Sequence, residues 1–244
     1  MGHEHSSVKI QRALQLHECG QLDEARLIYQ EIIKENQIQP AVLNLYGTLL
    51  HQQGFHAVAV NLLKKAIVLN SNNEIYYNRL GAALNGMEDN NKAVVAYSRS
   101  TFIKNDLFES HFNLGSALLK IGRIIEAYIP AKRAVHLNTD SWVARLRLGS
   151  IYQSMEKYEQ AIQEFNLASE KYPFALEPYF QLCRIYNKIQ NSKEGLKAAK
   201  KGLILAPERF EFYPQLHGIS LIKNQPQNFK VLRWAEQTVF VRTT

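Results

Sequence analysis

Apolar residues recur at helical spacing along most of the 244-residue chain. The stretch HFNLGSALLKIGRIIEAY, residues 111–128, has apolar side chains on one side of each of two predicted helices, which a short turn at residues 120–123 joins. Gly115 stands in the middle of the first helix, although glycine there costs about 1 kcal/mol relative to alanine. We therefore expect this glycine to have a packing role that offsets the cost.

Small residues recur every 34 residues in two separate series. The first series is Gly47, Gly81, Gly115, Gly149 and then Cys183, and the second is Ala25, Ala59, Ala93, Ala127, Ala161 and then Gly195. A bulky apolar residue precedes each member of the first series. A fixed period of this length is the signature of stacked helical repeats. We expect the small residues to let the two helices of each repeat approach closely.

The tripeptides LYG, RLG, NLG and RLG that carry the glycine series, each followed by an alanine twelve residues later, resemble the tetratricopeptide repeat family. The resemblance implies an all-α fold, a right-handed α-solenoid of six 34-residue helix-turn-helix repeats with a C-terminal helical cap. The repeats would cover residues 6–209 after a polar N-terminus at 1–5, and would begin at Ser6, Pro40, Glu74, Phe108, Trp142 and Leu176. Residues 210–244 would form a partial seventh repeat and a capping helix. Because this last segment stays apolar up to Phe240, it would cover the last repeat, pack against a further domain or mediate self-association.

The phase of each first helix separates a core side from a polar side. Positions 4, 7, 8 and 11 of a repeat share the core side, whereas positions 2, 5, 9, 12 and 13 lie opposite, with position 6 at the margin. The resemblance implies that this opposite side, here called the groove face, lines a concave ligand-binding groove. Its candidate binding residues are amides and cations, namely Asn44, Asn78, Arg79, Asn113, Lys120, Arg147, Arg184, Asn187 and Lys188.

These side chains suit an extended acidic peptide. Amides bond a peptide backbone, and arginines bond carboxylates. Arg79 and Arg147 occupy equivalent positions two repeats apart, which places them roughly 20 Å from each other if neighbouring first helices are about 10 Å apart. The carboxylate clamp of heat-shock co-chaperones is matched only by Asn113 and Arg147, and the asparagine ladder of O-linked N-acetylglucosamine transferases only by Asn113.

Composition narrows the setting of the protein. Lys and Arg outnumber Asp and Glu by 29 to 22, which favours acidic partners, but no basic stripe typical of nucleic-acid binding is present. No run of 18 apolar residues and no secretory signal are visible, so we expect a cytoplasmic protein without a membrane span. Cys19 and Cys183 are too far apart in sequence to indicate a disulfide framework, and whether Gly2 is lipidated stays open.

No catalytic motif stands out, so we predict no enzymatic activity and no cofactor. His17 and His51 share a groove position in adjacent repeats, but a third ligand is missing, so no metal site is predicted. The sequence thus predicts a non-catalytic protein–protein interaction scaffold that binds an extended acidic segment. Two alternatives remain. The first is a substrate-recruiting region of a larger glycosyltransferase-like or other enzyme, since the early repeats are similar to those that precede catalytic domains in bacteria; the second is nucleic-acid binding.

Overall fold

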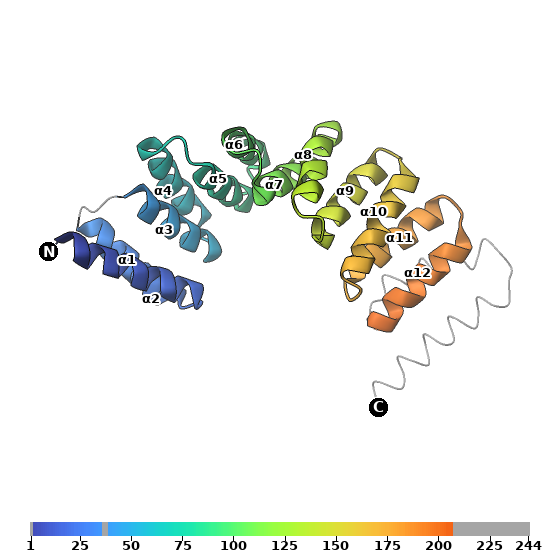
Figure 1. Ribbon diagram of the computed structural model, residues 1–244, viewed down its shortest axis with the longest axis horizontal. Helices are drawn as coiled ribbons and strands as arrows, with labels where there is room; N and C mark the ends of the chain where they lie inside the picture. Colours follow the sequence, from blue (N-terminus) through green and yellow to red (C-terminus); the bar gives the residue numbers. More distant parts are fainter. Residues whose placement is uncertain (1, 36–38, 207–244) are drawn as a thin grey trace, which may run out of the picture. The chain divides into compact units, whose positions relative to one another are not determined.

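A computed structural model describes residues 2–35 and 39–206 (Figure 1). In these ranges all regular secondary structure is α-helical, so the predicted all-α fold is confirmed. The helices are α1 Gly2–Glu18, α2 Leu22–Lys34, α3 Pro40–Gln52, α4 His56–Leu69, α5 Glu74–Gly86, α6 Asn90–Ile103, α7 Phe108–Lys120, α8 Ile124–Leu137, α9 Trp142–Ser154, α10 Tyr158–Lys171, α11 Leu176–Lys188 and α12 Ser192–Leu205. The predicted partial repeat and cap at 210–244 lie outside the described residues.

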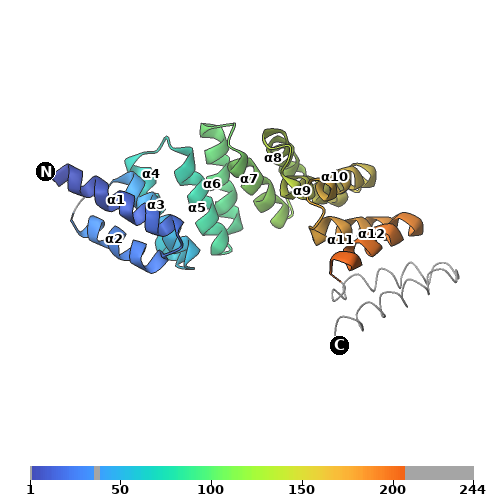
Figure 2. The ribbon, with the colours of Figure 1, turned by 60° about the horizontal axis from the view of Figure 1, so that its bottom comes forward.

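Consecutive helices pack in antiparallel pairs, from α1 with α2 to α11 with α12. The chain divides between Leu137 and Asn138 into two compact units. In the first unit, α3, α5 and α7 form one row and α4, α6 and α8 form another (Figures 1 and 2). Helix α5 contacts both neighbours in its own row and also α4, which belongs to the preceding pair. Of the described helices, none is long and apolar enough to cross a membrane.

The turn inside each helical pair has one residue in the left-handed conformation. These residues repeat every 34 positions and are Gly20, Gly54, Glu88, Gly122, Glu156 and Gln190, with φ between 57° and 85°. At the second turn the Gly54 N–H donates to His51 O at 3.0 Å, and the Phe55 N–H donates to Leu50 O at 2.8 Å. This pair of hydrogen bonds is the Schellman arrangement, which satisfies the last carbonyls of the first helix and reverses the chain.

The small-residue series lie where the two helices of a pair meet. The alanines of the second series are fully buried. A methyl group added at Gly149 would lie 2.5 Å from Cε1 of Phe165, and one added at Gly81 would lie 2.6 Å from Cε1 of Tyr97. At Gly115 it would lie 3.2 Å from the backbone nitrogen of Ala131. The predicted packing role of the glycine series is therefore confirmed.

The core side predicted for the first helices is also confirmed in α7. His111, Leu114, Gly115 and Leu118, at positions 4, 7, 8 and 11, are all buried. Positions 3 and 10 are buried as well, because each first helix packs against a neighbouring repeat in addition to its own partner. The buried arc of a first helix is thus wider than a single amphipathic stripe.

Buried polar groups link successive repeats of the first unit. The hydroxyls of Ser100 and Ser110 share a hydrogen bond of 2.7 Å, and Ser100 Oγ also donates to Glu74 O at 2.7 Å. His111 Nε2 lies 3.0 Å from Oδ1 of Asn105. In the second unit, Phe165 of α10 packs in a core with Leu182 and Cys183 of α11 and Leu203 of α12.

Candidate functional site

The groove face of the first unit presents two cations without an ion-pair partner among the described residues. Arg79 is exposed on α5, and Lys120 is exposed at the end of α7. The half-buried His51 of α3 has a lowered pKa, because burial disfavours the imidazolium and because His56 and Arg79 add positive charge nearby. The arginine is therefore close enough to act electrostatically on the neighbouring repeat.

The asparagines of this unit differ from the prediction. Asn44 and Asn78 were expected on an open groove face, but both are buried, with exposed fractions of 8% and 7%. Asn113 of α7 donates from Nδ2 to Oδ1 of Asn78 on α5 at 3.1 Å. Position 5 thus faces the next first helix, and its amide ties two repeats together. Oδ1 of Asn44 has no hydrogen-bond partner among the described residues.

In the second unit, Arg147, which was predicted on the margin of the groove face, is partly buried on α9. Its Nε is buried without a hydrogen-bond partner in the described part of the chain. Burial lowers the pKa of Arg147, and the nearby Glu177 carboxylate opposes this effect. Arg147 belongs to the second unit and Arg79 to the first, so their expected 20 Å separation stays a prediction.

The other candidates of the second unit lie on α11. Arg184 is exposed, stacks at 5.9 Å from the ring centroid of Phe180 and donates to Gln181 Oε1 at 3.4 Å. Lys188 pairs with Glu156 at 3.5 Å and lies 5.1 Å from the ring centroid of Tyr158. Asn187 is half-buried. Four of the five predicted cations, all except Lys188, thus form no ion pair with a described residue.

The two histidines considered as metal ligands have separate partners. Nε2 of His17 lies 2.8 Å from Oε1 of Gln52, whereas Nδ1 of His51 lies 3.0 Å from Nδ1 of His56. Over the described ranges, no group of three or more His, Cys, Asp or Glu side chains is placed to hold a metal ion. The arrangement therefore offers hydrogen bonds and positive charge.

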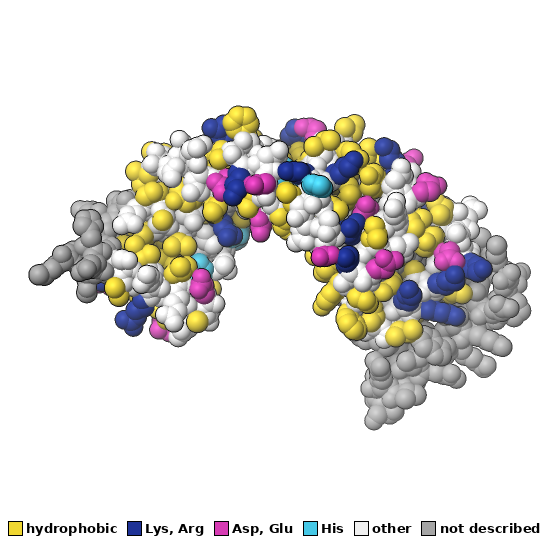
Figure 3. All heavy atoms as spheres, viewed as in Figure 1, with side chains coloured by type: hydrophobic (Ala, Val, Ile, Leu, Met, Phe, Trp, Pro, Cys, Tyr) yellow, Lys and Arg dark blue, Asp and Glu magenta, His cyan; other side chains and the backbone are white. Residues whose placement is uncertain are grey.

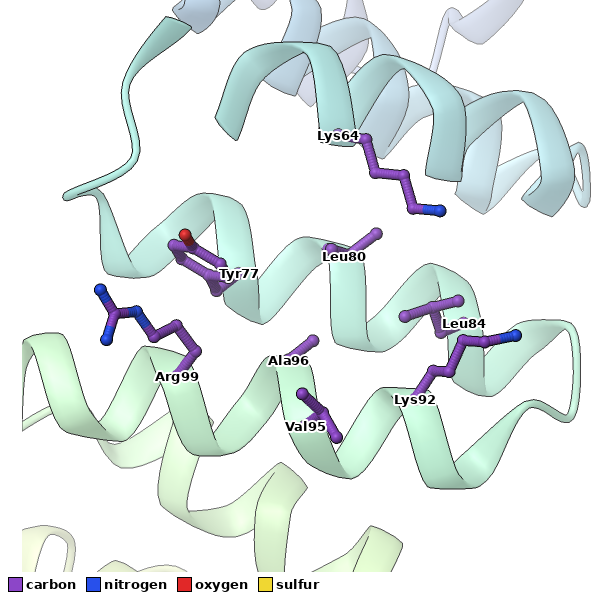
Figure 4. A pocket seen from close by; sticks show the side chains of 8 residues that line it. All are labelled: Lys64, Tyr77, Leu80, Leu84, Lys92, Val95, Ala96 and Arg99. Atoms are coloured by element: carbon purple, nitrogen blue, oxygen red, sulfur yellow. The ribbon is translucent and has the colours of Figure 1, made fainter. Parts of the chain in front are cut away.

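One cavity was missed by the sequence reasoning. A slot of about 420 Å³ opens between α4 and α6, with α5 as its floor, and is here called the α4–α6 slot (Figure 4). Its lining consists of Lys64, Tyr77, Leu80, Leu84, Lys92, Val95, Ala96 and Arg99. A signal for it was present in the sequence: Ala96 stands where the repeats before and after have the larger Leu62 and Pro130.

The sequence resembles known repeat proteins. Residues 144–170 match the family model of the tetratricopeptide repeat. The peroxisomal targeting signal receptor of Kluyveromyces lactis is 29% identical over 91 residues, which are 37% of this chain and 16% of the receptor. Anaphase-promoting complex subunit 3 of Schizosaccharomyces pombe is 22% identical over 138 residues, 57% of this chain and 21% of that protein. The chain thus matches less than a quarter of the length of these curated relatives.

Solved structures agree with the fold. PilF of Pseudomonas aeruginosa superposes with a TM-score of 0.74 at 14% identity, covering 88% of this chain and 98% of PilF. YrrB, described as a TPR protein with an unusual peptide-binding site, superposes with a TM-score of 0.67 at 19% identity, covering 76% of this chain and 95% of YrrB. The chain therefore has the α-solenoid fold of tetratricopeptide-repeat proteins, and residues 144–170 match one such repeat.

Proposed function

We propose that this protein is a non-catalytic scaffold that binds an extended, acidic segment of a partner protein along a concave groove face. The observation that carries the proposal is the set of four groove-face cations, Arg79, Lys120, Arg147 and Arg184, that form no ion pair with a described residue. Cations without an ion-pair partner attract the carboxylates of a ligand and so position an acidic peptide. We further propose six repeats over residues 6–209, with 210–244 as the partial seventh repeat and cap.

Each unit would contribute in its own way. In the first unit, Arg79 and Lys120 meet carboxylates of the ligand, while the Asn113–Asn78 hydrogen bond holds α5 and α7 in register. In the second unit, Arg184 is already oriented by the Phe180 ring and by Gln181, so binding a carboxylate costs little side-chain entropy. Arg147 is half withdrawn from solvent, where an ion pair gains more than at an exposed site.

The test begins with the natural partner, isolated by affinity pull-down from the source cells and identified by mass spectrometry. The affinity of its binding segment is then measured for Arg79→Glu/Lys120→Glu. We expect a loss of about fivefold or more, since each exposed ion pair contributes up to about 1 kcal/mol. Both residues lie outside the buried arc, so the variant should remain folded by circular dichroism.

The matched control is Lys65→Glu/Lys132→Glu, which makes the same charge change at exposed positions of α4 and α8. This control should leave the affinity unchanged. Equal losses in the two double variants would show that only net charge matters and would contradict a groove site.

A second candidate function is recruitment of substrates within a larger enzyme. It is favoured by one observation: the curated relatives match over only 16–21% of their own length, so similar repeats occur there as parts of longer proteins. Identification of a catalytic domain joined to these repeats in the native gene product would support it. Nucleic-acid binding is disfavoured because Glu109 and Glu177 lie on the same face as the cations.

A further inference from the structure

The α4–α6 slot combines an apolar floor with a basic rim. Leu80, Leu84 and Ala96 form the floor and are almost fully buried, while Val95 forms an open wall that is 70% exposed. Figure 4 shows Arg99 and Lys92 toward the two ends of the slot and Lys64 across it on α4. A volume of about 420 Å³ lies within the range of about 300–1,000 Å³ that is usual for ligand pockets.

The slot lies away from the groove face. Both Tyr77 and Leu84 are turned by roughly 140–160° from Arg79 around the axis of α5, as 100° per residue requires. A ligand in the slot therefore leaves the groove face accessible. The two surfaces thus lie on different sides of α5, which contributes Tyr77 and Leu84 to the slot and Arg79 to the groove face.

Apolar surface continues beyond the slot along the outer sides of α4 and α6. Phe102 of α6 is 78% exposed and Val68 of α4 is 83% exposed. Figure 3 shows hydrophobic and basic side chains next to one another over α6. Lys92, Val95, Arg99 and Phe102 follow the i, i+3, i+7 and i+10 spacing of one helix side, so basic and apolar groups alternate along it.

The charge around the slot is positive. Helices α4 and α6 carry two Lys or Arg residues each and no Asp or Glu. The carboxylate of Asp89 at the start of α6 lies nearby: Lys92 bonds it at 2.6 Å, and both Lys92 and Lys64 help to lower its pKa. Lys64 and Arg99 form no ion pair with a described residue, although Arg99 stacks on Phe102 at 5.1 Å from the ring centroid. The rim thus keeps positive charge for a ligand.

At the equivalent positions of the next repeat, both the basic rim and the small floor residue of the slot are changed. Ser98 stands where Lys64 is, and Glu126 stands where Lys92 is, so two of the three cations are lost. Pro130, which has a larger side chain, stands where Ala96 is. The combination of an open apolar floor and a basic rim is therefore a property of this repeat rather than of the 34-residue pattern.

We propose that the α4–α6 slot is a second docking site, which binds an acidic linear segment of a partner protein through one bulky apolar side chain. The apolar side chain enters the slot against Leu80, Leu84 and Ala96, and flanking carboxylates of the segment meet Lys64 and Arg99. A recessed apolar floor with cations around it requires a protruding anchor, which a peptide provides and a flat bilayer surface does not.

The test uses a display library of random twelve-residue peptides, sorted on the full chain. We expect enrichment of peptides in which a Leu, Phe or Trp is flanked by Asp and Glu. Affinities of the enriched peptides, labelled with fluorescein, are then measured by fluorescence anisotropy. Val95→Glu and Lys64→Glu should each weaken binding by about tenfold or more. Both side chains are exposed, so neither change should disturb folding.

Ala96→Leu provides an independent variant, because the larger side chain, which the preceding repeat has at Leu62, would fill the slot, and it too should abolish most binding. Two controls should leave affinity unchanged: Lys65→Glu, which reverses the neighbouring cation outside the slot, and Arg79→Glu, which alters the groove face. Since the controls separate the two surfaces, failure of the slot does not entail failure of the groove proposal.

Three results would overturn the proposal. The first is that no peptide is enriched, or that the enriched peptides lack acidic residues. The second is that Arg79→Glu weakens their binding and Val95→Glu does not, which would assign them to the groove face. The third is that peptides fail while the chain co-sediments with vesicles of phosphatidylcholine and 30% phosphatidylserine, with equal losses for Lys64→Glu and Lys65→Glu. That result would identify a membrane-binding surface instead.

Discussion

Alanine at Gly149 should destabilise the protein, whereas alanine at Gly115 should not. The added methyl group at Gly149 would lie 2.5 Å and 2.7 Å from Cε1 and Cδ1 of Phe165, well inside the ordinary carbon–carbon contact of about 3.5–4.0 Å. Phe165 is fully buried, so relief requires a shift of the ring by about 1 Å in a packed core. Overpacking of this kind costs about 1–3 kcal/mol, and the better helix propensity of alanine returns about 1 kcal/mol. The expected net loss is about 1 kcal/mol.

At Gly115 the same methyl group would lie 3.2 Å from the nitrogen and 3.3 Å from Cβ of Ala131. A shift of a few tenths of an ångström relieves these contacts, so the propensity gain should offset the strain and leave stability nearly unchanged. Leucine at Gly115 is a different matter. Its larger side chain would have to displace α8, and we expect a loss of about 1–3 kcal/mol.

The assay is urea unfolding followed by far-UV circular dichroism, with the free energy of unfolding compared across the three variants. A double-mutant cycle of Gly149→Ala with Phe165→Leu tests the cause, because a smaller side chain at 165 should accept the methyl group and make the double variant more stable than additivity predicts. If the two alanine variants lose equal stability, or if the cycle shows no coupling, close approach of the helices is not the reason for the glycine series.

The remaining predictions concern a turn, a histidine and a thiol. Gln190→Gly should raise the free energy of unfolding by about 1 kcal/mol, because Gln190 has a left-handed φ of 57° that glycine adopts without strain. Gly54→Ala should lower the free energy of unfolding by a similar amount because of its positive φ, although no atom lies within 4 Å of the added methyl group. Thermal unfolding measures both effects. Because the pKa of His51 is lowered in the folded chain, the unfolded chain binds the proton more readily. The free energy of unfolding should therefore fall as the pH decreases from about 6.5 through the lowered pKa, and it should fall less in His51→Gln. Urea titrations between pH 7 and pH 5 measure this difference. Burial raises the pKa of the Cys183 thiol to about 12, so iodoacetamide at pH 8 should modify the exposed Cys19 first, and mass spectrometry should find Cys183 protected until the second unit unfolds.

The repeat pattern was predictable because close packing leaves a regular trace in the sequence. Only a glycine or another small residue fits against Phe165 or Ala131, so the series that contains Gly115 and Gly149 marks the point where the two helices of a pair meet. The turn residues also recur every 34 positions, but this series is harder to recognise in the sequence because only some of its members are glycine. Glu88 follows the turn glycines at the same interval and keeps their left-handed conformation without being glycine.

The binding face was less predictable, because the polar and apolar pattern of one helix does not show which of its residues are buried by the neighbouring helices. Position 5 lies on the polar, outward side of an isolated amphipathic helix, yet contact between α3 and α5 and between α5 and α7 buries Asn44 and Asn78. Arg147 is withdrawn from solvent in the same way. The slot could be predicted only from a comparison of equivalent positions in successive repeats. Ala96 is smaller than Leu62 and Pro130 at the same position, and this difference in side-chain volume, not in polarity, leaves space for the cavity.

The most direct test of the scaffold proposal is site-specific photo-cross-linking in the source cells. A photoreactive amino acid is placed at Asn85, an exposed groove-face position on α5, and in a matched protein at Gln163, an exposed position on the second helix of its pair, α10. The proposal predicts that Asn85 cross-links to one partner protein through an acidic segment, that Arg79→Glu/Lys120→Glu removes this product, and that Gln163 gives none. A partner captured at Gln163 but not at Asn85, or a product at Asn85 that survives the charge reversal, would contradict it.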